Sequence, residues 1–143
     1  MALTSEASAV WNGDLPSGSG SITLDSSKLA TFSYNWKARS EGESGVSTPE
    51  ELIAAAHAGC YAMAFSNELA TAGHTPTRVS AKAAVSFDIA QGGITGSHLI
   101  VDAEVPGISE EEFQRIAAAA KAGCPVSKAL AGVEITLEAT LSA

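Results

Sequence analysis

Residues 48–73 read TPEELIAAAHAGCYAMAFSNELATAG, and this stretch decides the fold. Thr48 can cap a helix, Pro49 fits the first helical position, and Glu51 follows the cap by three residues, as in a capping box. Gly73 supplies a stop signal at the far end. We therefore predict one helix of about 25 residues, roughly 37 Å long at 1.5 Å per residue.

The middle of this predicted helix is apolar or small on every face. Between Leu52 and Phe65 the one strongly polar side chain is His57. A helix that is apolar all round must be covered on all sides, and this apolar part is too short to span a membrane. We therefore expect an intertwined homodimer with its two long helices back to back. A monomer that wraps its own helix is the alternative, although two-fold dimers are the commonest soluble oligomers.

Length and composition indicate a single folded domain, residues 1–143. The chain is 45% hydrophobic, has a formal net charge of −8, and carries only eight scattered Lys and Arg residues. Such a chain has no basic stripe for a phosphate backbone, so we expect no nucleic-acid partner. The first residues lack a cationic start followed by an apolar run, which predicts no signal peptide, no membrane segment and a cytoplasmic location. Two cysteines in that compartment are usually reduced thiols, metal ligands or redox groups.

The remaining chain is predicted to be strands followed by strands and helices. Alternating apolar residues, turn residues and a second capping box at Ser109 and Glu112 mark these elements. We expect a three-stranded meander with strands near 7–11, 22–24 and 32–36 and a turn at 18–21, a loop at 38–47, the long helix, a hairpin over 78–105, helices from 109 to about 122 and over 125–131, and a last strand at 133–141. The order βββ-α-ββ-αα-β indicates an α+β fold with antiparallel sheets around the long central helix.

Cys60 lies in the middle of the predicted long helix. A cysteine in such a place is commonly a small core residue without chemistry. It is about twelve residues from the helix start, beyond the reach of the helix dipole, and apolar surroundings raise a thiol pKa. A reactive Cys60 therefore needs a positive charge brought from another segment.

Arg39 can bring that charge, because it precedes the long helix and is the one arginine before Cys60. A guanidinium beside the sulfur favours the thiolate and can hold a substrate oxygen. A buried arginine needs an acidic partner, and Glu50 in the first turn of the helix is available. Alternatively, Arg39 is a solvated loop residue and Glu50 a surface carboxylate that complements the helix dipole.

His57 shares a helix face with Cys60, one turn away. A Cys-His pair is conceivable, but a core histidine satisfied by a carbonyl group is the commoner case. His57, Cys60 and Cys124 could also supply three zinc ligands. The sequence has no CxxC motif or second nearby histidine, so we predict no metal and no cofactor.

Cys124 has better intrinsic electrostatics than Cys60. Pro125 follows it, which puts Cys124 at the N-cap of the short helix, where backbone amides favour a thiolate. By these physical arguments alone, either cysteine can be the attacking sulfur.

Three motifs occur in a fixed order: R-S-E-G-E from Arg39, T-P-E-E-L-I-A-A-A-H-A-G-C ending at Cys60, and K-A-G-C-P-V-S from Lys121 to Ser127. In order and separation they resemble the osmotically inducible protein C (OsmC) and organic hydroperoxide resistance (Ohr) family of thiol peroxidases. The resemblance extends over essentially the whole chain. Gly18 and Ser19 occupy the N-terminal turn, near which the Ohr branch places its arginine, so the chain is more similar to the OsmC branch.

The resemblance implies a role for each candidate residue. Cys60 corresponds to the peroxidatic thiolate, Cys124 to the resolving thiol, Arg39 to the activating cation and Glu50 to its carboxylate partner. It also implies an intertwined homodimer with two sites at the subunit interface. Gly59 departs from the alanine or serine expected before the cysteine, at a cost of about 1 kcal/mol in mid-helix, so we expect a close backbone or substrate approach there.

The implied chemistry is reduction of a hydroperoxide by Cys60, condensation of the sulfenic acid with Cys124, and reduction of the resulting disulfide by an external small or protein dithiol, for which a lipoyl group is a candidate. Apolar surroundings that include Met63 and Phe65 favour organic hydroperoxides over hydrogen peroxide. Two other classes remain open. One is a non-catalytic thiol redox sensor or small-molecule-binding dimer, and the other is a structural dimer with two inert cysteines.

Overall fold

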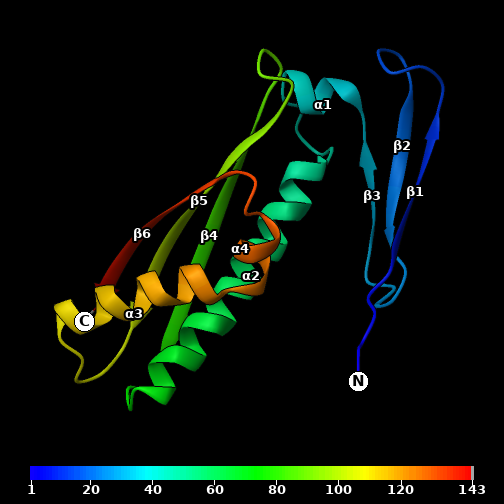
Figure 1. Ribbon diagram of the computed structural model, residues 1–143. Helices are drawn as coiled ribbons and strands as arrows, with labels where there is room; N and C mark the ends of the chain where they lie inside the picture. The colour runs from blue at the N-terminus through cyan, green and yellow to red at the C-terminus, as the bar shows by residue number, and fades with distance from the viewer. Residues whose placement is uncertain (143) are drawn as a thin grey trace. The chain divides into compact units, whose positions relative to one another are not determined.

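The computed structural model describes residues 1–142, which form two compact units, Met1–Pro49 and a second unit that begins at Glu50 (Figure 1). The element order is βββ-αα-ββ-αα-β, so the predicted α+β class is confirmed. Within residues 1–142, no helix has both the length and the apolar character needed to cross a bilayer.

The N-terminal unit is an antiparallel meander followed by one short helix. Its sheet has the order β1 (Ala7–Asn12), β2 (Ser19–Leu24) and β3 (Thr31–Tyr34), which confirms the predicted three strands. The rings of Trp11 and Tyr34 meet edge to face, with centroids 5.3 Å apart, and so join the two outer strands across β2.

Two local predictions for this unit were wrong. Trp36 is not on the third strand, because α1 (Trp36–Ser40) begins there, inside a segment that we expected to be extended chain and loop. Asn35 caps this helix, since its side-chain oxygen accepts from the backbone N–H of Ala38 at 2.7 Å. The first turn also comes earlier than 18–21, because Asp14 accepts hydrogen bonds from the backbone and hydroxyl of Ser17.

The second unit contains a sheet with the order β4 (Arg78–Asp88), β5 (Gly93–Glu104) and β6 (Glu134–Ser142). β4 and β5 form the predicted antiparallel hairpin. The prediction of antiparallel pairing throughout was wrong for β6, which runs parallel to β5. The reason is the connection, because two helices, α3 (Glu110–Gly123) and α4 (Pro125–Ala129), carry the chain back before it re-enters the sheet.

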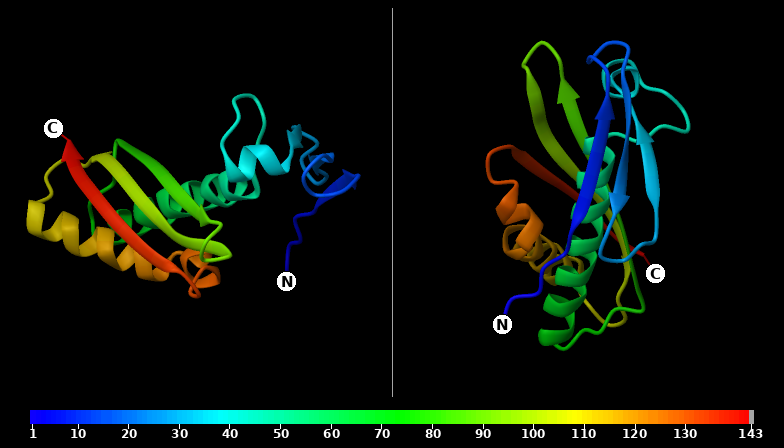
Figure 2. Two further views of the ribbon diagram at one scale, coloured as in Figure 1. Left: turned by 90° about the horizontal axis from the view of Figure 1, so that it is seen from above. Right: turned by 90° about the vertical axis from the view of Figure 1, so that its right-hand side faces the viewer.

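The core of this unit lies between the sheet and two helices, α2 (Pro49–Thr71) and α3, which pack on the same face of the sheet (Figures 1 and 2). Alternate residues of β5 point to the helices, as the period of a strand requires. The buried cluster consists of Tyr61, Phe65 and Leu69 from α2, Leu99, Val101, Ala103 and Val105 from β5 and its end, Phe113, Ile116, Ala117 and Ala120 from α3, and Cys124.

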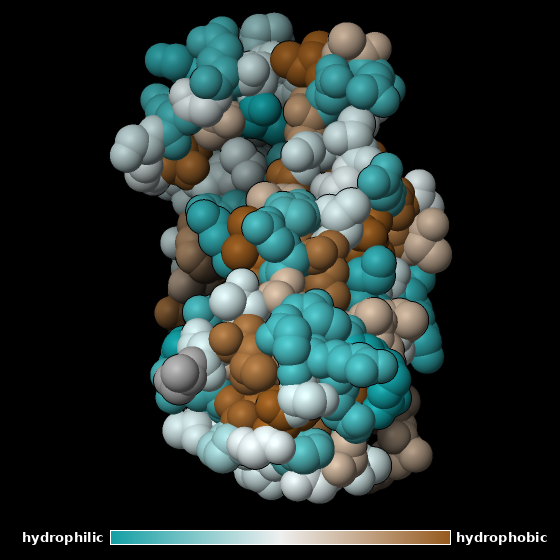
Figure 3. All heavy atoms as spheres, turned by 90° about the vertical axis from the view of Figure 1, so that its left-hand side faces the viewer, coloured by the Kyte–Doolittle hydropathy of each residue, from teal (hydrophilic) through white to brown (hydrophobic). Residues whose placement is uncertain are grey.

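The long helix α2 has nearly the predicted bounds, and it ends before Gly73, whose φ of 89° suits glycine. It is not covered on every side by its own chain. Its buried residues recur along one face, whereas Ala56, Gly59 and Met63 on another face are exposed. Other apolar side chains reach the surface in separate patches among polar residues, as Figure 3 shows for one side of the molecule.

Candidate functional site

The two cysteines lie side by side in the second unit. Cys60 is half-buried in the middle of α2, and Cys124 is fully buried between α3 and α4. Neither forms a disulfide, and the thiol of Cys60 donates a hydrogen bond to the sulfur of Cys124. The fold therefore brings together two cysteines from distant parts of the sequence, positions 60 and 124.

The surroundings of Cys124 favour its ionised form. Burial alone would raise the pKa of this thiol, but the backbone N–H of Ser127, the thiol of Cys60, the Ser127 hydroxyl and the Val126 amide outweigh burial, so that the pKa is lowered. The expectation that Cys124 has good intrinsic electrostatics at a helix start is thus supported by its neighbours.

Cys60 shows the opposite tendency. Burial raises the pKa of its thiol, the amide of Val126 opposes this in part, and the neighbouring Cys124 raises it further. Within its own unit, then, Cys60 keeps its proton and shares it with Cys124. This agrees with the sequence-based argument that the position of Cys60 does not activate its thiol.

His57 is fully buried and uses both of its ring nitrogens. Nδ1 lies 2.7 Å from the hydroxyl of Ser97 on β5, and Nε2 lies 2.8 Å from the hydroxyl of Ser127 on α4. Burial lowers the pKa of His57, so the ring is held neutral. The expected carbonyl partner is therefore replaced by two hydroxyls. With both nitrogens engaged, His57 is neither a base for Cys60 nor a zinc ligand with the two cysteines.

Tyr61 lies near the cysteine pair, on the same face of α2 as His57. Its hydroxyl donates to the backbone carbonyl of Ala117 at 2.9 Å, and its ring is fully buried. Burial and the negative charge of Cys124 raise the pKa of Tyr61. Tyr61 therefore contributes a neutral wall to the site.

The other two predicted site residues belong to different units. Arg39 is in the N-terminal unit, in the last turn of α1, where it lines a pocket of about 250 Å³. The other lining residues of this pocket are largely apolar: Trp11, Leu15, Tyr34, Asn35, Trp36 and Pro49. Glu50 is in the second unit, buried in the first turn of α2. The four-residue site thus stays a prediction, and the contact between Cys60 and Cys124 is the part of it that the second unit shows.

The structure bears on two further expectations about the neighbours of Cys60. Apart from its two neighbours and the backbone of its own helix turns, no atom of the described chain comes within 4 Å of a Cβ built on Gly59, so no other segment of the chain approaches it closely. Phe65 is fully buried against Phe113, with ring centroids 5.4 Å apart, in the core cluster against which Cys60 packs. Met63 is 77% exposed and is free to meet a partner or a substrate.

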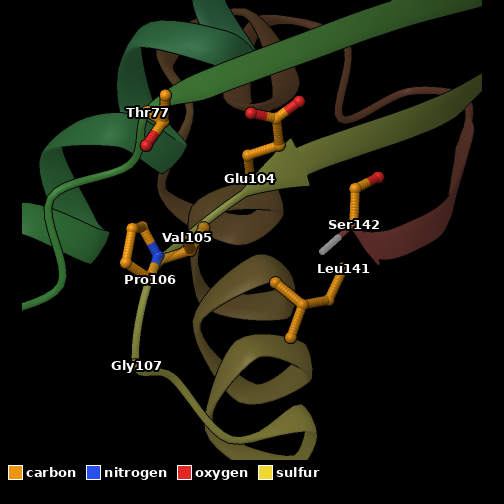
Figure 4. Close-up of a pocket in the computed structure, with 7 residues that line it drawn as sticks. All are labelled: Thr77, Glu104, Val105, Pro106, Gly107, Leu141 and Ser142. Carbon is orange, nitrogen blue, oxygen red and sulfur yellow. The ribbon is translucent and has the colours of Figure 1, made fainter.

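A separate pocket lies where β5 and β6 end. It has a volume of about 490 Å³ and is lined by Thr77, Glu104, Val105, Pro106, Gly107, Leu141 and Ser142 (Figure 4). None of these residues is a cysteine or a histidine. The Glu104 carboxylate accepts from Arg78, which leaves the pocket without an obvious reactive group, and the cysteine pair remains the candidate site.

Sequence reasoning missed Ser97, Ser127 and Tyr61 as members of the site. One signal was available for Ser97, since it is a polar residue at a position of β5 whose neighbours on the same face, Leu99 and Val101, are core residues. Ser127 follows Cys124 by three residues and can turn its hydroxyl back to the helix start. No sequence signal pairs either serine with His57.

Comparison with known proteins gives one consistent family. A family model described as OsmC-like protein matches residues 41–138. Peroxiredoxin OsmC of Escherichia coli (strain K12) is 42% identical over 140 residues, which cover 96% of both proteins, and the protein of that name from Shigella flexneri matches to the same extent.

Solved structures agree on the fold. An organic hydroperoxide resistance protein OsmC from Legionella pneumophila aligns with a TM-score of 0.74 and 24% identity, over 97% of this chain and 98% of that chain. The organic hydroperoxide resistance protein OhrB of Bacillus subtilis aligns with a TM-score of 0.65 and 25% identity, over 94% and 98%.

Proposed function

We propose, because this chain belongs to the OsmC-like protein family, that Cys60 and Cys124 are the redox pair of a thiol-dependent peroxidase. The family and its OsmC branch, predicted from three motifs, are confirmed by the matched family model and by the curated relatives. The chain is thus a hydroperoxide-related redox protein of peroxidase type. The observation that carries the finer proposal is the direct contact between the two sulfurs.

Cys60 is the proposed attacking residue because its side chain is half-buried, whereas Cys124 is fully buried. A hydroperoxide can reach the first sulfur without any movement of the core. The Cys60 thiolate attacks the O–O bond, sulfur keeps one oxygen as sulfenic acid, and the other oxygen leaves as an alkoxide that takes a proton. A hydroperoxide is consumed, and an alcohol is released.

Activation of Cys60 requires a group beyond its own unit, since burial and Cys124 both raise its pKa. Arg39 is the proposed cation, and Glu50 is the proposed carboxylate that orients it. An arginine that lines an apolar pocket suits a substrate with a polar O–O head and an organic tail. Organic hydroperoxides are therefore the proposed substrates, ahead of hydrogen peroxide.

Cys124 is the proposed resolving residue. Its sulfur displaces hydroxide from the Cys60 sulfenic acid, so that a Cys60–Cys124 disulfide forms and the hydroxide is protonated to water. An external dithiol, for which a lipoyl group is a candidate, then reduces the disulfide and is itself oxidised. The proposed location is the cytoplasm, where such reductants are kept reduced.

A homodimer is also proposed, because α2 exposes Ala56, Gly59 and Met63 on one face. This face has the small residues that allow two helices to approach closely. Ala56→Glu should shift the protein toward monomer in sedimentation velocity, because it places a charge on that face. Thr71→Glu, at the exposed end of the same helix, is the matched control.

The test of the peroxidase function is steady-state turnover of cumene hydroperoxide and hydrogen peroxide with lipoyl, glutathione and thioredoxin reductants. Cys60→Ser should abolish turnover, and the wild-type protein should turn over cumene hydroperoxide faster than hydrogen peroxide. Equal rates for the two peroxides would remove the proposed preference. Stoichiometric oxidation without turnover under every reductant would instead favour the redox-sensor alternative.

A further inference from the structure

The polar centre of the second unit is His57, at a place where the core is otherwise apolar. It is fully buried on α2, and its partners Ser97 and Ser127 are also buried, at 2% and 6% exposure. The two hydrogen bonds, 2.7 Å and 2.8 Å, connect α2 to β5 and to α4. A buried polar group of this kind is costly unless every donor and acceptor is used, so its arrangement is strongly constrained.

Counting protons limits this cluster to two arrangements. A neutral imidazole has one N–H donor and one acceptor nitrogen, and each serine hydroxyl has one proton. If Nε2 carries the proton, it donates to Ser127, and the hydroxyl of Ser97 must donate to Nδ1. If Nδ1 carries the proton, it donates to Ser97, and Ser127 must spend its own proton on Nε2.

Cys124 selects between the two arrangements. The Ser127 side chain hydrogen-bonds to the sulfur of Cys124, which also accepts from Cys60. Once ionised, this sulfur can only accept, and it therefore needs the proton of Ser127. The Ser127 proton is available only when Nε2–H of His57 donates to Ser127. The hydrogen bond to Cys124 therefore fixes which atom donates at each of the other two hydrogen bonds.

We propose that Ser97, His57 and Ser127 form a relay of hydrogen-bond donors that points at Cys124 and holds its sulfur as the resolving nucleophile. Ser97 donates to Nδ1 of His57, Nε2–H donates to Ser127, and Ser127 donates to the sulfur. The three are positioning residues, because none of them touches the peroxide. The effect on catalysis rests on the proposed function, whereas the effect on the Cys124 thiol does not.

The relay acts on the second step of the proposed cycle. There the Cys124 thiolate forms an S–S bond with the sulfur of the Cys60 sulfenic acid, and the S–O bond breaks with loss of hydroxide. A sulfur that receives fixed donors stays ionised at a lower pH and keeps one position against Cys60. The relay therefore favours fast disulfide formation over further oxidation of Cys60.

The direct test measures ionisation of Cys124 by the ultraviolet absorbance of its thiolate in a Cys60→Ser background, where the serine still offers a donor. The titratable group that acts on this sulfur in the structure is Cys60, and Tyr61, whose own pKa Cys124 raises, stays unchanged in every variant. Ser127→Ala and His57→Leu should each raise the pKa of Cys124 by about one unit, a tenfold smaller thiolate-to-thiol ratio below that pKa.

Two variants keep this test specific. His57→Gln retains one donor and one acceptor and should restore much of the lowered pKa. His98→Leu is the matched control, because His98 also bonds a hydroxyl, that of Thr136 at 2.6 Å, and the carboxylate of Glu138 at 3.2 Å, but on the outer face of the sheet. It should leave the Cys124 titration unchanged.

A second readout does not depend on any variant. Imidazole nitrogen chemical shifts in the reduced protein should show the neutral His57 ring with its proton on Nε2. A proton on Nδ1, or an unchanged Cys124 titration in folded Ser127→Ala, would overturn the relay. If the titration shifts as expected while Cys60→Ser retains full peroxide turnover, the relay stands and the proposed role of Cys60 as the attacking residue fails.

Discussion

Ser97→Ala tests whether the buried histidine is held as the hydrogen bonds indicate. The change removes the hydroxyl that lies 2.7 Å from Nδ1 of His57 and leaves an acceptor buried without a partner. Such a group costs about 1–3 kcal/mol of unfolding free energy, a large part of the roughly 5–15 kcal/mol of a typical domain. The space left by one hydroxyl oxygen is too small to admit a water freely.

The size of the effect can be separated from simple loss of packing by a double-mutant cycle. His57→Leu alone should also destabilise the protein, because it strands the two serine hydroxyls. Combining His57→Leu with Ser97→Ala should cost about 0.5–3 kcal/mol less than the sum of the single changes, since the apolar leucine needs no partner. Urea unfolding with a constant m-value is the assay. Additive losses within error would refute the inferred pairing.

Three further perturbations test other parts of the account. Tyr61→Phe should lower the free energy of unfolding by about 0.5–1.5 kcal/mol at neutral pH, because it removes the hydrogen bond to Ala117. The wild-type protein should lose stability above about pH 10, where tyrosine ionises in the unfolded chain but, with its raised pKa, stays neutral in the folded one. Tyr61→Phe should remove this alkaline loss. Denaturant unfolding against pH measures both effects, and a wild-type alkaline loss that persists in Tyr61→Phe would contradict them. Gly59→Ala should stabilise α2 by about 1 kcal/mol in a monomer, because the added methyl group meets open space in the single chain. It should raise the dimer dissociation constant, because the same methyl group would stand between two closely packed helices. An unchanged dissociation constant in sedimentation equilibrium would argue against helix contact at Gly59. Arg39→Met should slow sulfenic acid formation at neutral pH by about tenfold for each unit by which the pKa of Cys60 rises, and the rate should recover at higher pH. Arg78→Met is the control, because it breaks only exposed ion pairs to Asp102 and Glu104 and should leave the rate unchanged. Stopped-flow measurement of Cys60 oxidation distinguishes the two results.

The parts of the fold that local sequence determines were predicted well. The bounds of α2 follow from its cap signals and Gly73, and Ser109 caps α3 as expected, with its hydroxyl 3.2 Å from the backbone nitrogen of Glu112. The helix α1 was missed because five residues are too few to show a helical period, and its main signal is the single cap residue Asn35.

Long-range relations were predicted less well, because sequence spacing does not encode them. The direction of β6 depends on how far α3 and α4 carry the chain back across the sheet. The partners of His57 are 40 and 70 residues away, and only the folded core shows that two serines, rather than a carbonyl group, satisfy the ring. The pairing of Cys60 with Cys124 came from family resemblance and not from the spacing of the residues.

The central claim is that Cys60 attacks the peroxide and Cys124 closes the disulfide. Treating the reduced protein with one equivalent of cumene hydroperoxide and mapping the product by peptide mass spectrometry tests it most directly. We expect a Cys60–Cys124 disulfide in the wild-type protein, and a sulfenic acid trapped by dimedone on Cys60 in Cys124→Ser. A dimedone adduct on Cys124 in Cys60→Ser, formed as fast as the wild-type disulfide, would contradict the account.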